Sequence, residues 1–109
     1  MSKFNLEKLK KLKYDLFKYA GVNPCKGTYA KSKNGNTVSV TSRNAVHCCS
    51  EGVLRRVFDG WYNNNFDLKN LIRQNHTSGH SLIVWNDNPR RSLVTIRKEM
   101  QKACRKAFA

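Results

Sequence analysis

The dipeptide Asn34-Gly35 lies between two short runs in which apolar and polar residues alternate. Asn-Gly between strand-like runs is the strongest short-range signal for a β-hairpin, because both central residues of the tight turn need positive φ. We therefore expect strands near Lys26–Ser32 and Asn36–Val40. Since 109 residues leave room for one domain with one modest core, this hairpin must share that core with the segments on either side of it.

Segments with helical periodicity flank the predicted hairpin. The first helix is expected to begin after Asn5, which suits an N-cap, and to end at Gly21, a residue favoured just past helix C-termini. The last helix is expected to begin after Ser92. Apolar residues recur at three- and four-residue steps in both helices. The two stripes are Leu6, Leu9, Leu12, Leu16 and Ala20 in the first helix and Leu93, Ile96, Met100, Ala103, Cys104 and Ala107 in the last.

Another helix is predicted after the hairpin. It begins after Ser42 or Asn44, runs to roughly Phe58 and ends at Gly60. Gly52 falls in its middle, where glycine costs about 1 kcal/mol relative to alanine. A glycine at this position is consistent with another backbone segment that comes close to the helix.

The segment between Phe58 and the last helix gives weaker signals. A shorter helix is expected after Asp67, while the apolar run Leu82–Trp85 fits a buried strand and a helical turn equally well. The chain has no internal repeat and no linker long enough to separate two domains. The predicted fold is one small α+β domain spanning residues 1–109, with about four helices around one β-hairpin.

Charge is the most unusual property of the composition. The chain has 21 Lys and Arg residues against 7 Asp and Glu, for a net charge of +14. The excess lies in residues 1–44 and 81–109, whereas residues 45–80 are nearly neutral. Such an uneven basic excess favours a polyanionic partner, which can be nucleic acid, an anionic membrane surface or an acidic protein face.

The sequence favours a cytoplasmic protein without membrane association. No apolar run approaches the roughly 20 residues of a membrane helix, and the first residues lack the apolar core of a secretory signal. Since nothing else indicates secretion, we expect the cysteines to be reduced and largely buried. They are Cys25, Cys48, Cys49 and Cys104.

Cysteine and histidine residues raise two chemical hypotheses. His76 and His80 have a spacing that zinc fingers use, but the matching pair of cysteines is absent, so core and loop positions are the simpler interpretation. Cys48 is a candidate nucleophile with His80 as its base, whereas His47, its neighbour on a helix, would point about 100° away. Paired carboxylates are scarce, and a Gly-rich phosphate loop is absent. We therefore predict no catalytic residues, no metal and no cofactor, and we favour a protein that is not an enzyme.

The turn Trp85-Asn86-Asp87 precedes Pro89 and the last helix. Asn86 or Asp87 is expected to satisfy backbone groups in this turn and thereby to set where the last helix begins. Asp87 is also placed to pair with Arg90 or Arg91. A structural role is the favoured interpretation, and a role in binding or catalysis is the alternative.

Basic residues of the first helix, the hairpin and the last helix form a phosphate-binding surface if these elements share a face. The alternative is that they only solvate the outer faces of helices. We predict contacts with DNA or RNA phosphates from Lys8, Lys11, Lys31, Lys33, Arg90, Arg91, Lys98, Lys102 and Arg105. Aromatic anchors are expected at Tyr29, Trp61 and Tyr62. The second functional hypothesis is a module or inhibitor that docks onto an acidic face of a host enzyme or defence complex.

Four motifs follow one another along the chain: Lys26–Ala30, Asn34-Gly35, Ala45–Leu54 and Trp85–Ser92. In this order they resemble a family of small uncharacterised proteins of bacteria and bacteriophages, over roughly residues 21–109. The chain departs from the family pattern at Val53, where alanine is usual, and at Pro24-Cys25, where an aromatic residue is common. The resemblance implies a bacteriophage or mobile-element setting, and hence a host cytoplasm, but it implies no activity and no catalytic residues.

Overall fold

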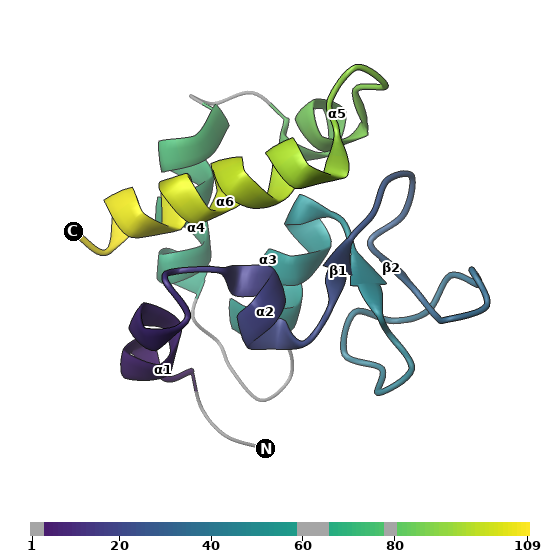
Figure 1. Cartoon of the computed structure of the whole chain (residues 1–109), viewed down its shortest axis with the longest axis horizontal. Helices are drawn as coiled ribbons and strands as arrows, with labels where there is room; N and C mark the ends of the chain where they lie inside the picture. Colours follow the sequence, from purple (N-terminus) through teal and green to yellow (C-terminus); the bar gives the residue numbers. More distant parts are fainter. Residues whose placement is uncertain (1–3, 59–65, 78–80) are drawn as a thin grey trace.

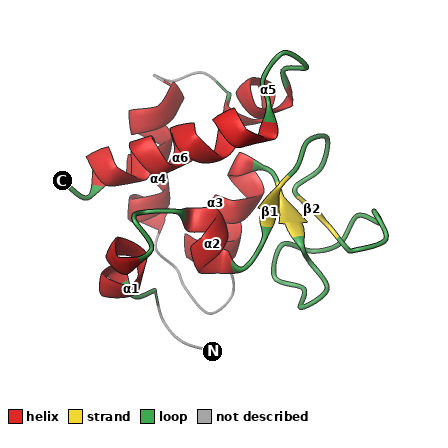
Figure 2. Ribbon diagram, viewed as in Figure 1, coloured by secondary structure: helices red, strands yellow, loops and turns green. Residues whose placement is uncertain are grey.

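A small sheet lies at one end of a group of packed helices (Figure 1). The computed structural model describes residues 4–58, 66–77 and 81–109. Its elements in chain order are α1 (Leu6–Lys11), α2 (Leu16–Ala20), β1 (Asn23–Pro24), β2 (Ala30–Lys31), β3 (His47–Cys48), α3 (Ser50–Phe58), α4 (Phe66–Thr77), α5 (Leu82–Asp87) and α6 (Leu93–Ala107). Figure 2 shows the helices on one side and the strands with their long loops on the other. The predicted α+β class is confirmed, with six described helices where about four were expected.

The described sheet has the strand order β1-β3-β2, and each strand has two residues. β1 runs parallel to β3, and β2 runs antiparallel to it. Because side chains alternate between the two faces of a strand, the paired residues form two rows across the sheet. The outer row is Asn23, His47 and Lys31, and the buried row is Pro24, Cys48 and Ala30.

The second predicted helix starts later than expected. It spans Ser50–Phe58 instead of beginning after Ser42 or Asn44, and strand β3 occupies part of the intervening segment. Its predicted end near Phe58 is confirmed, while Gly60 lies outside the described residues.

Hydrogen bonds along both edges of β3 explain this difference. Cys25 donates its backbone N–H to the carbonyl oxygen of Cys48, and Val46 donates to that of Lys31, both at 2.9 Å. Cys48 is also fully buried. These contacts with segments distant in the sequence outweigh the local helical periodicity, which concerns only neighbours along the chain.

The predicted hairpin is present but shorter than expected. Ser32 donates its N–H to the carbonyl oxygen of Asn36 at 2.8 Å, and a single bridge pairs Lys31 with Thr37. Of the Asn-Gly pair only Gly35 has positive φ (85°), so the turn is not the type in which both central residues do. The strands expected over residues 26–32 and 36–40 are thus reduced to one or two paired residues each.

The first predicted helix is divided into α1 and α2. Lys13 and Tyr14 separate them and both have positive φ, at 57° and 63°. Asp15 provides a second N-cap, at the start of α2. The predicted caps at the outer ends, Asn5 and Gly21, are confirmed. Breaking the helix lets both short pieces turn their apolar sides towards the core.

The C-terminal helices agree with the sequence pattern more closely. Ser92 caps α6 by accepting the N–H of Thr95 at 3.1 Å, as predicted. The undecided apolar run is helical and forms the first part of α5. Leu93, expected in the core stripe, is instead 45% exposed, whereas the stripe from Ile96 to Cys104 is buried. α4 begins at Phe66, one residue ahead of the predicted cap Asp67.

The core lies where α6, α3, α4 and the two N-terminal helices meet. Its fully buried large residues include Leu9, Leu16, Phe17, Val53, Leu54, Phe58, Ile72, Ile96 and Met100. One carboxylate, that of Glu51, is buried among them and accepts hydrogen bonds from Arg55 at 3.0 Å and Arg73 at 2.6 Å, which joins α3 to α4.

None of the described helices has the length and apolar character needed to cross a membrane.

His76, in α4, is half-buried beside the core. The ring of His76 packs edge-on against Trp85, with 4.1 Å between the ring centroids, and its Nε2 is buried with no hydrogen-bond partner among the described residues. Burial lowers the pKa of His76 from about 6.5 to about 4; the nearby Glu99 opposes this shift, and Arg91 reinforces it. In the unfolded chain the imidazole keeps its ordinary pKa.

Acid is therefore expected to destabilise the protein through His76. Between about pH 6.5 and pH 4 the unfolded chain holds a proton on this ring that the folded protein does not, so stability falls as pH falls through that range. Urea unfolding midpoints at several pH values measure the decline. His76→Phe keeps an aromatic ring against Trp85 but cannot take up a proton, so its decline should be distinctly smaller. Equal declines in both proteins would contradict this role of His76.

Candidate nucleic-acid interface

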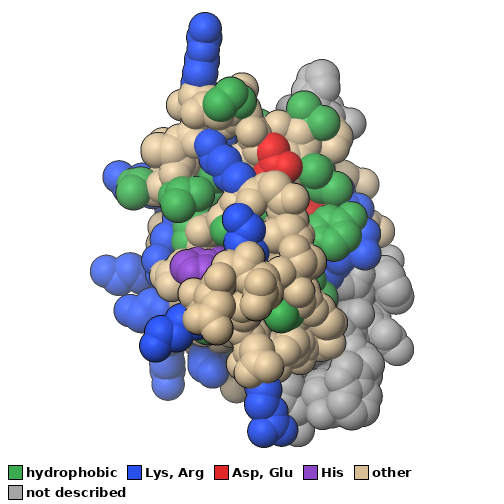
Figure 3. All heavy atoms as spheres, turned by 90° about the vertical axis from the view of Figure 1, so that its right-hand side faces the viewer, with side chains coloured by type: hydrophobic (Ala, Val, Ile, Leu, Met, Phe, Trp, Pro, Cys, Tyr) green, Lys and Arg blue, Asp and Glu red, His purple; other side chains and the backbone are tan. Residues whose placement is uncertain are grey.

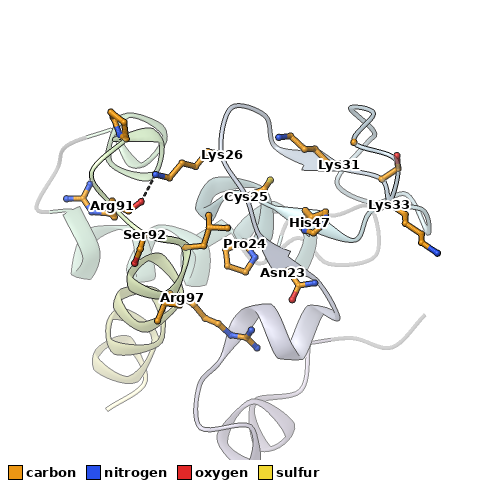
Figure 4. Close-up of a pocket in the computed structure, with 15 residues that line it drawn as sticks. Asn23, Pro24, Cys25, Lys26, Lys31, Lys33, His47, Arg91, Ser92 and Arg97 are labelled. Carbon is orange, nitrogen blue, oxygen red and sulfur yellow. Dashed lines mark hydrogen bonds between the residues drawn. The ribbon is translucent and has the colours of Figure 1, made fainter.

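An open groove of about 850 Å³ lies between the outer face of the sheet and the start of α6. One wall comes from β1, β3 and the hairpin, and the other from the turn before α6 and its first residues (Figure 4). Three segments that are far apart in the sequence therefore build it together. Pro24 of β1 lies close to the middle of the view in Figure 4.

The groove is strongly basic. Its charged lining residues are Lys26, Lys31, Lys33, Arg91 and Arg97, and no described residue that lines it is acidic. Arg97 is neutralised, because its Nε donates to the carboxylate of Asp15 at 2.8 Å. The ion pairs within the described part of the chain involve none of the other four cations. Figure 3, which looks onto this end of the molecule, shows several Lys and Arg side chains on the side where a histidine lies, and others spread over the rest of this face.

Backbone carbonyl groups hold two of these cations in place. The ammonium group of Lys26 reaches across to the turn before α6 and donates to the carbonyl oxygens of Asn88, at 2.7 Å, and Arg91 (Figure 4). The guanidinium of Arg91 lies 4.2 Å from the ring centroid of Trp85 and donates a hydrogen bond to the backbone carbonyl oxygen of Trp85. Because carbonyl oxygens carry no net charge, this wall of the groove stays positive.

α6 carries positive charge onward from the groove. Its first residues face the groove, so the positive end of the helix dipole adds to the charge there. Beyond them Lys98, Lys102 and Arg105 are exposed at three- and four-residue steps, which places them on one side of the helix. Arg105 reaches back towards the turn between α1 and α2, where it lies 5.9 Å from the ring centroid of Tyr14.

The structure brings together some of the nine predicted phosphate contacts. Lys31, Lys33 and Arg91 line the groove, although Figure 4 shows Lys33 extending outward from the hairpin at its rim. Lys98, Lys102 and Arg105 follow on α6, and Arg90 is exposed in the turn before it. Lys8 and Lys11 lie on α1, at the opposite end of the molecule from the sheet in Figure 1, and Lys8 covers the ring of Tyr19 at 5.1 Å.

Of the three predicted aromatic anchors, Tyr29 is the one within the described residues, and it is not among the residues that line the groove. Trp61 and Tyr62 lie outside the described residues. Tyr29 is partly exposed, but it borders a separate, smaller hollow with Ile83 and lies beneath the guanidinium of Arg55, 4.8 Å from the ring centroid.

Several groove residues were not predicted from the sequence. Asn23, Lys26, His47 and Arg97 line it, and His47 was considered from the sequence only as a base for Cys48. The outer row of Asn23, His47 and Lys31 forms because β1 and β2 both pair with β3. Each of these strands has only two residues, which is too short for an alternating pattern that sequence analysis can detect.

Trp85, Asn86 and Asp87 form the end of helix α5. Their role is structural, as favoured from the sequence, but Asn86 and Asp87 bond to distant backbone segments and not, as expected, to the turn that sets the start of α6. Asn86 is fully buried, and its amide accepts from the backbone N–H of Ser50 at 2.9 Å and donates to the carbonyl oxygen of Cys25 at 2.9 Å. Asp87 accepts the N–H of Gly27 at 3.1 Å. The ion pairs of the described residues do not include the expected pair of Asp87 with Arg90 or Arg91.

The cysteines are buried, and burial disfavours their reactive thiolate form. Cys48 has no exposed surface, and burial raises the pKa of its thiol to about 12, which disfavours the thiolate that a nucleophile needs. Burial also raises the pKa of Cys25 to about 11 and that of Cys104 to about 12. His80, one of the two proposed zinc ligands, lies outside the described residues, within which no group of three or more His, Cys, Asp or Glu residues is placed to hold a metal ion.

Comparison of the chain with models of known protein families, with curated proteins and with solved structures finds no significant match.

Proposed function

We propose that this protein binds nucleic acid through contacts between its basic groove and backbone phosphates, without catalysing a reaction. The observation that supports the proposal is a group of four cations in one groove that take part in none of the ion pairs of the described residues: Lys26, Lys31, Lys33 and Arg91. Phosphate contacts supply affinity but little sequence information, so binding is expected to depend weakly on base sequence. A bacteriophage setting is part of this proposal and rests on the sequence motifs alone.

Removing charge from the rim of the groove tests the proposal. The double substitution Lys31→Gln/Lys33→Gln is expected to weaken binding to labelled mixed-sequence oligonucleotides about tenfold or more at low salt. It should also reduce the slope of log affinity against log salt concentration by about 1.4 to 1.8, because each lost phosphate contact removes roughly 0.7 to 0.9. Fluorescence anisotropy at several salt concentrations measures both quantities.

A matched control separates the groove from the overall charge. Lys8→Gln/Lys11→Gln removes the same two charges from α1, away from the groove. Its affinity and salt slope should stay close to those of the unaltered protein. An equal loss in both variants would mean that net charge, and not the groove, determines binding. Failure of the unaltered protein to bind any oligonucleotide at low salt would refute the proposal.

An acidic protein surface is the second candidate partner. Val84 is 72% exposed, and the neighbouring Ile83 borders a hollow together with the partly exposed Tyr29. Exposed apolar groups beside basic ones are typical of protein interfaces. Capture of a partner from a nuclease-treated host lysate, lost on Val84→Asp, would favour this function, whereas capture that nuclease abolishes would favour nucleic acid.

A further inference from the structure

We propose that the basic groove takes unpaired nucleotides of single-stranded DNA or RNA and does not take a duplex. This inference rests on the proposed nucleic-acid binding and specifies which form of nucleic acid the groove accepts. Its basis is the chemistry of the groove surface between the cations, which offers contacts that only an exposed base can use.

The outer row of the sheet supplies the first of these contacts. Asn23 and Lys31 are the register partners of His47 on its two sides, so the three side chains lie next to one another in the groove. The row therefore presents an amide, a planar imidazole and an ammonium group in sequence (Figure 4). Histidine rings stack on unpaired bases, amides bond to base edges, and ammonium groups bind phosphates.

The facing wall supplies apolar surface. Leu93 and Val94, at the start of α6, line the groove and are 45% and 63% exposed. Covering this apolar surface is favourable only if the ligand group that covers it is itself apolar enough to leave water at little cost. The flat face of an unpaired base is such a group, whereas phosphates and sugars are not.

A duplex cannot use this surface. Its bases are stacked on one another, so only their edges and the sugar–phosphate backbone face outward, and reading the edges in the major groove takes a protruding helix or β-ribbon. Here the cations and the apolar groups line a hollow instead. A single strand can place a base in the hollow while its backbone continues over Lys98, Lys102 and Arg105, the exposed cations of α6.

Competition between matched oligonucleotides tests the inference. Labelled single strands of DNA and of RNA, and the corresponding DNA duplex, are titrated with the full-length protein at one salt concentration. We expect the single strands to bind at least about tenfold more tightly than the duplex. The DNA and RNA arms show whether the sugar matters.

Two substitutions test the base contacts separately from the charges. His47→Ala is expected to lower the affinity for single strands by about 5- to 150-fold, the range for one lost base-stacking residue, with no change in the salt slope. Because His47 lies in the central strand, the exposed residue Val94 provides a second variant, Val94→Ser, which should also weaken binding without changing the slope. Val84→Ser, at an exposed valine outside the groove, is the control and should bind normally.

The outcomes separate this inference from the proposed function. Equal or tighter binding of the duplex, or full single-strand affinity in both His47→Ala and Val94→Ser, would overturn the inference while groove-dependent phosphate binding stands. Absence of binding to every oligonucleotide would overturn both.

Discussion

Replacing Gly52 by alanine is expected to destabilise the protein by about 3 kcal/mol or more, although alanine is the better helix former by about 1 kcal/mol. A Cβ at Gly52 would lie 2.9 Å from the carbonyl carbon of Tyr29 and closer still to its oxygen. These are backbone atoms, so they cannot rotate away as the tip of a side chain can. Either α3 or the segment before β2 must shift, and the hydrogen bond from the N–H of Cys49 to the Tyr29 carbonyl, at 3.2 Å, is lost or weakened.

The sign of the change in unfolding free energy decides between two effects of Gly52→Ala. Helix propensity alone predicts that Gly52→Ala stabilises the protein, and the close approach of Tyr29 predicts the opposite. Urea unfolding followed by circular dichroism measures the difference. Lys106→Ala, at an exposed position of α6, is the control and should stay within about 0.5 kcal/mol of the unaltered protein. A Gly52→Ala variant as stable as the parent would show that the two backbones do not meet.

Replacing Asn86 by alanine is the second large effect, and we expect a loss of about 4 kcal/mol. The side-chain oxygen of Asn86 accepts from both the backbone N–H and the hydroxyl of Ser50, at 2.9 and 2.7 Å, and its amide group donates to the carbonyl of Cys25. Alanine leaves these buried groups without partners, and each unsatisfied group costs about 1 to 3 kcal/mol. Since Ser50 is the first residue of α3, Asn86 caps that helix from a distant part of the chain.

Two comparisons sharpen the test of Asn86. Asn88→Ala, in the exposed turn two residues later, makes the same chemical change but removes only one solvent-accessible hydrogen bond, to the N–H of Arg90, so it should cost about 1 kcal/mol or less. Asn86→Asp keeps the acceptor for Ser50 but loses the donor to Cys25 and buries a carboxylate, so it should also be destabilising near neutral pH. Thermal and urea unfolding of the three variants measure these effects. Equal stability of Asn86→Ala and Asn88→Ala would contradict the capping role.

The buried Asn86 also bears on the candidate interface. It ties α5 to Cys25, which lines the groove beside Lys26, while Lys26 itself is bound to the turn before α6. The two walls of the groove are therefore connected by buried or backbone-directed hydrogen bonds. These hydrogen bonds hold Lys26 and Arg91 in position before a ligand arrives, which reduces the ordering cost of binding.

The candidate site could be predicted from the sequence only in part. The uneven charge identified the hairpin and the start of the last helix as basic, and Lys31, Lys33 and Arg91 do line one groove. The sequence contains no sign that Lys8 and Lys11 would lie apart on α1. Nor did charge alone reveal that Arg97 would be neutralised by Asp15, which is 82 residues away in the chain.

Local signals in the sequence determined the helix caps at Asn5, Gly21 and Ser92 and the buried stripe of α6, because each depends on residues within a few positions of one another. The sequence also indicated that Gly52 lets another backbone segment come close, but it did not indicate that this segment is the one at Tyr29. Only the tertiary structure decided that residues 47–48 form the central strand, since the hydrogen bonds that hold them come from segments around residues 24 and 31. The groove exists for the same physical reason: its walls meet through pairing and burial between distant segments, and no local periodicity records those contacts.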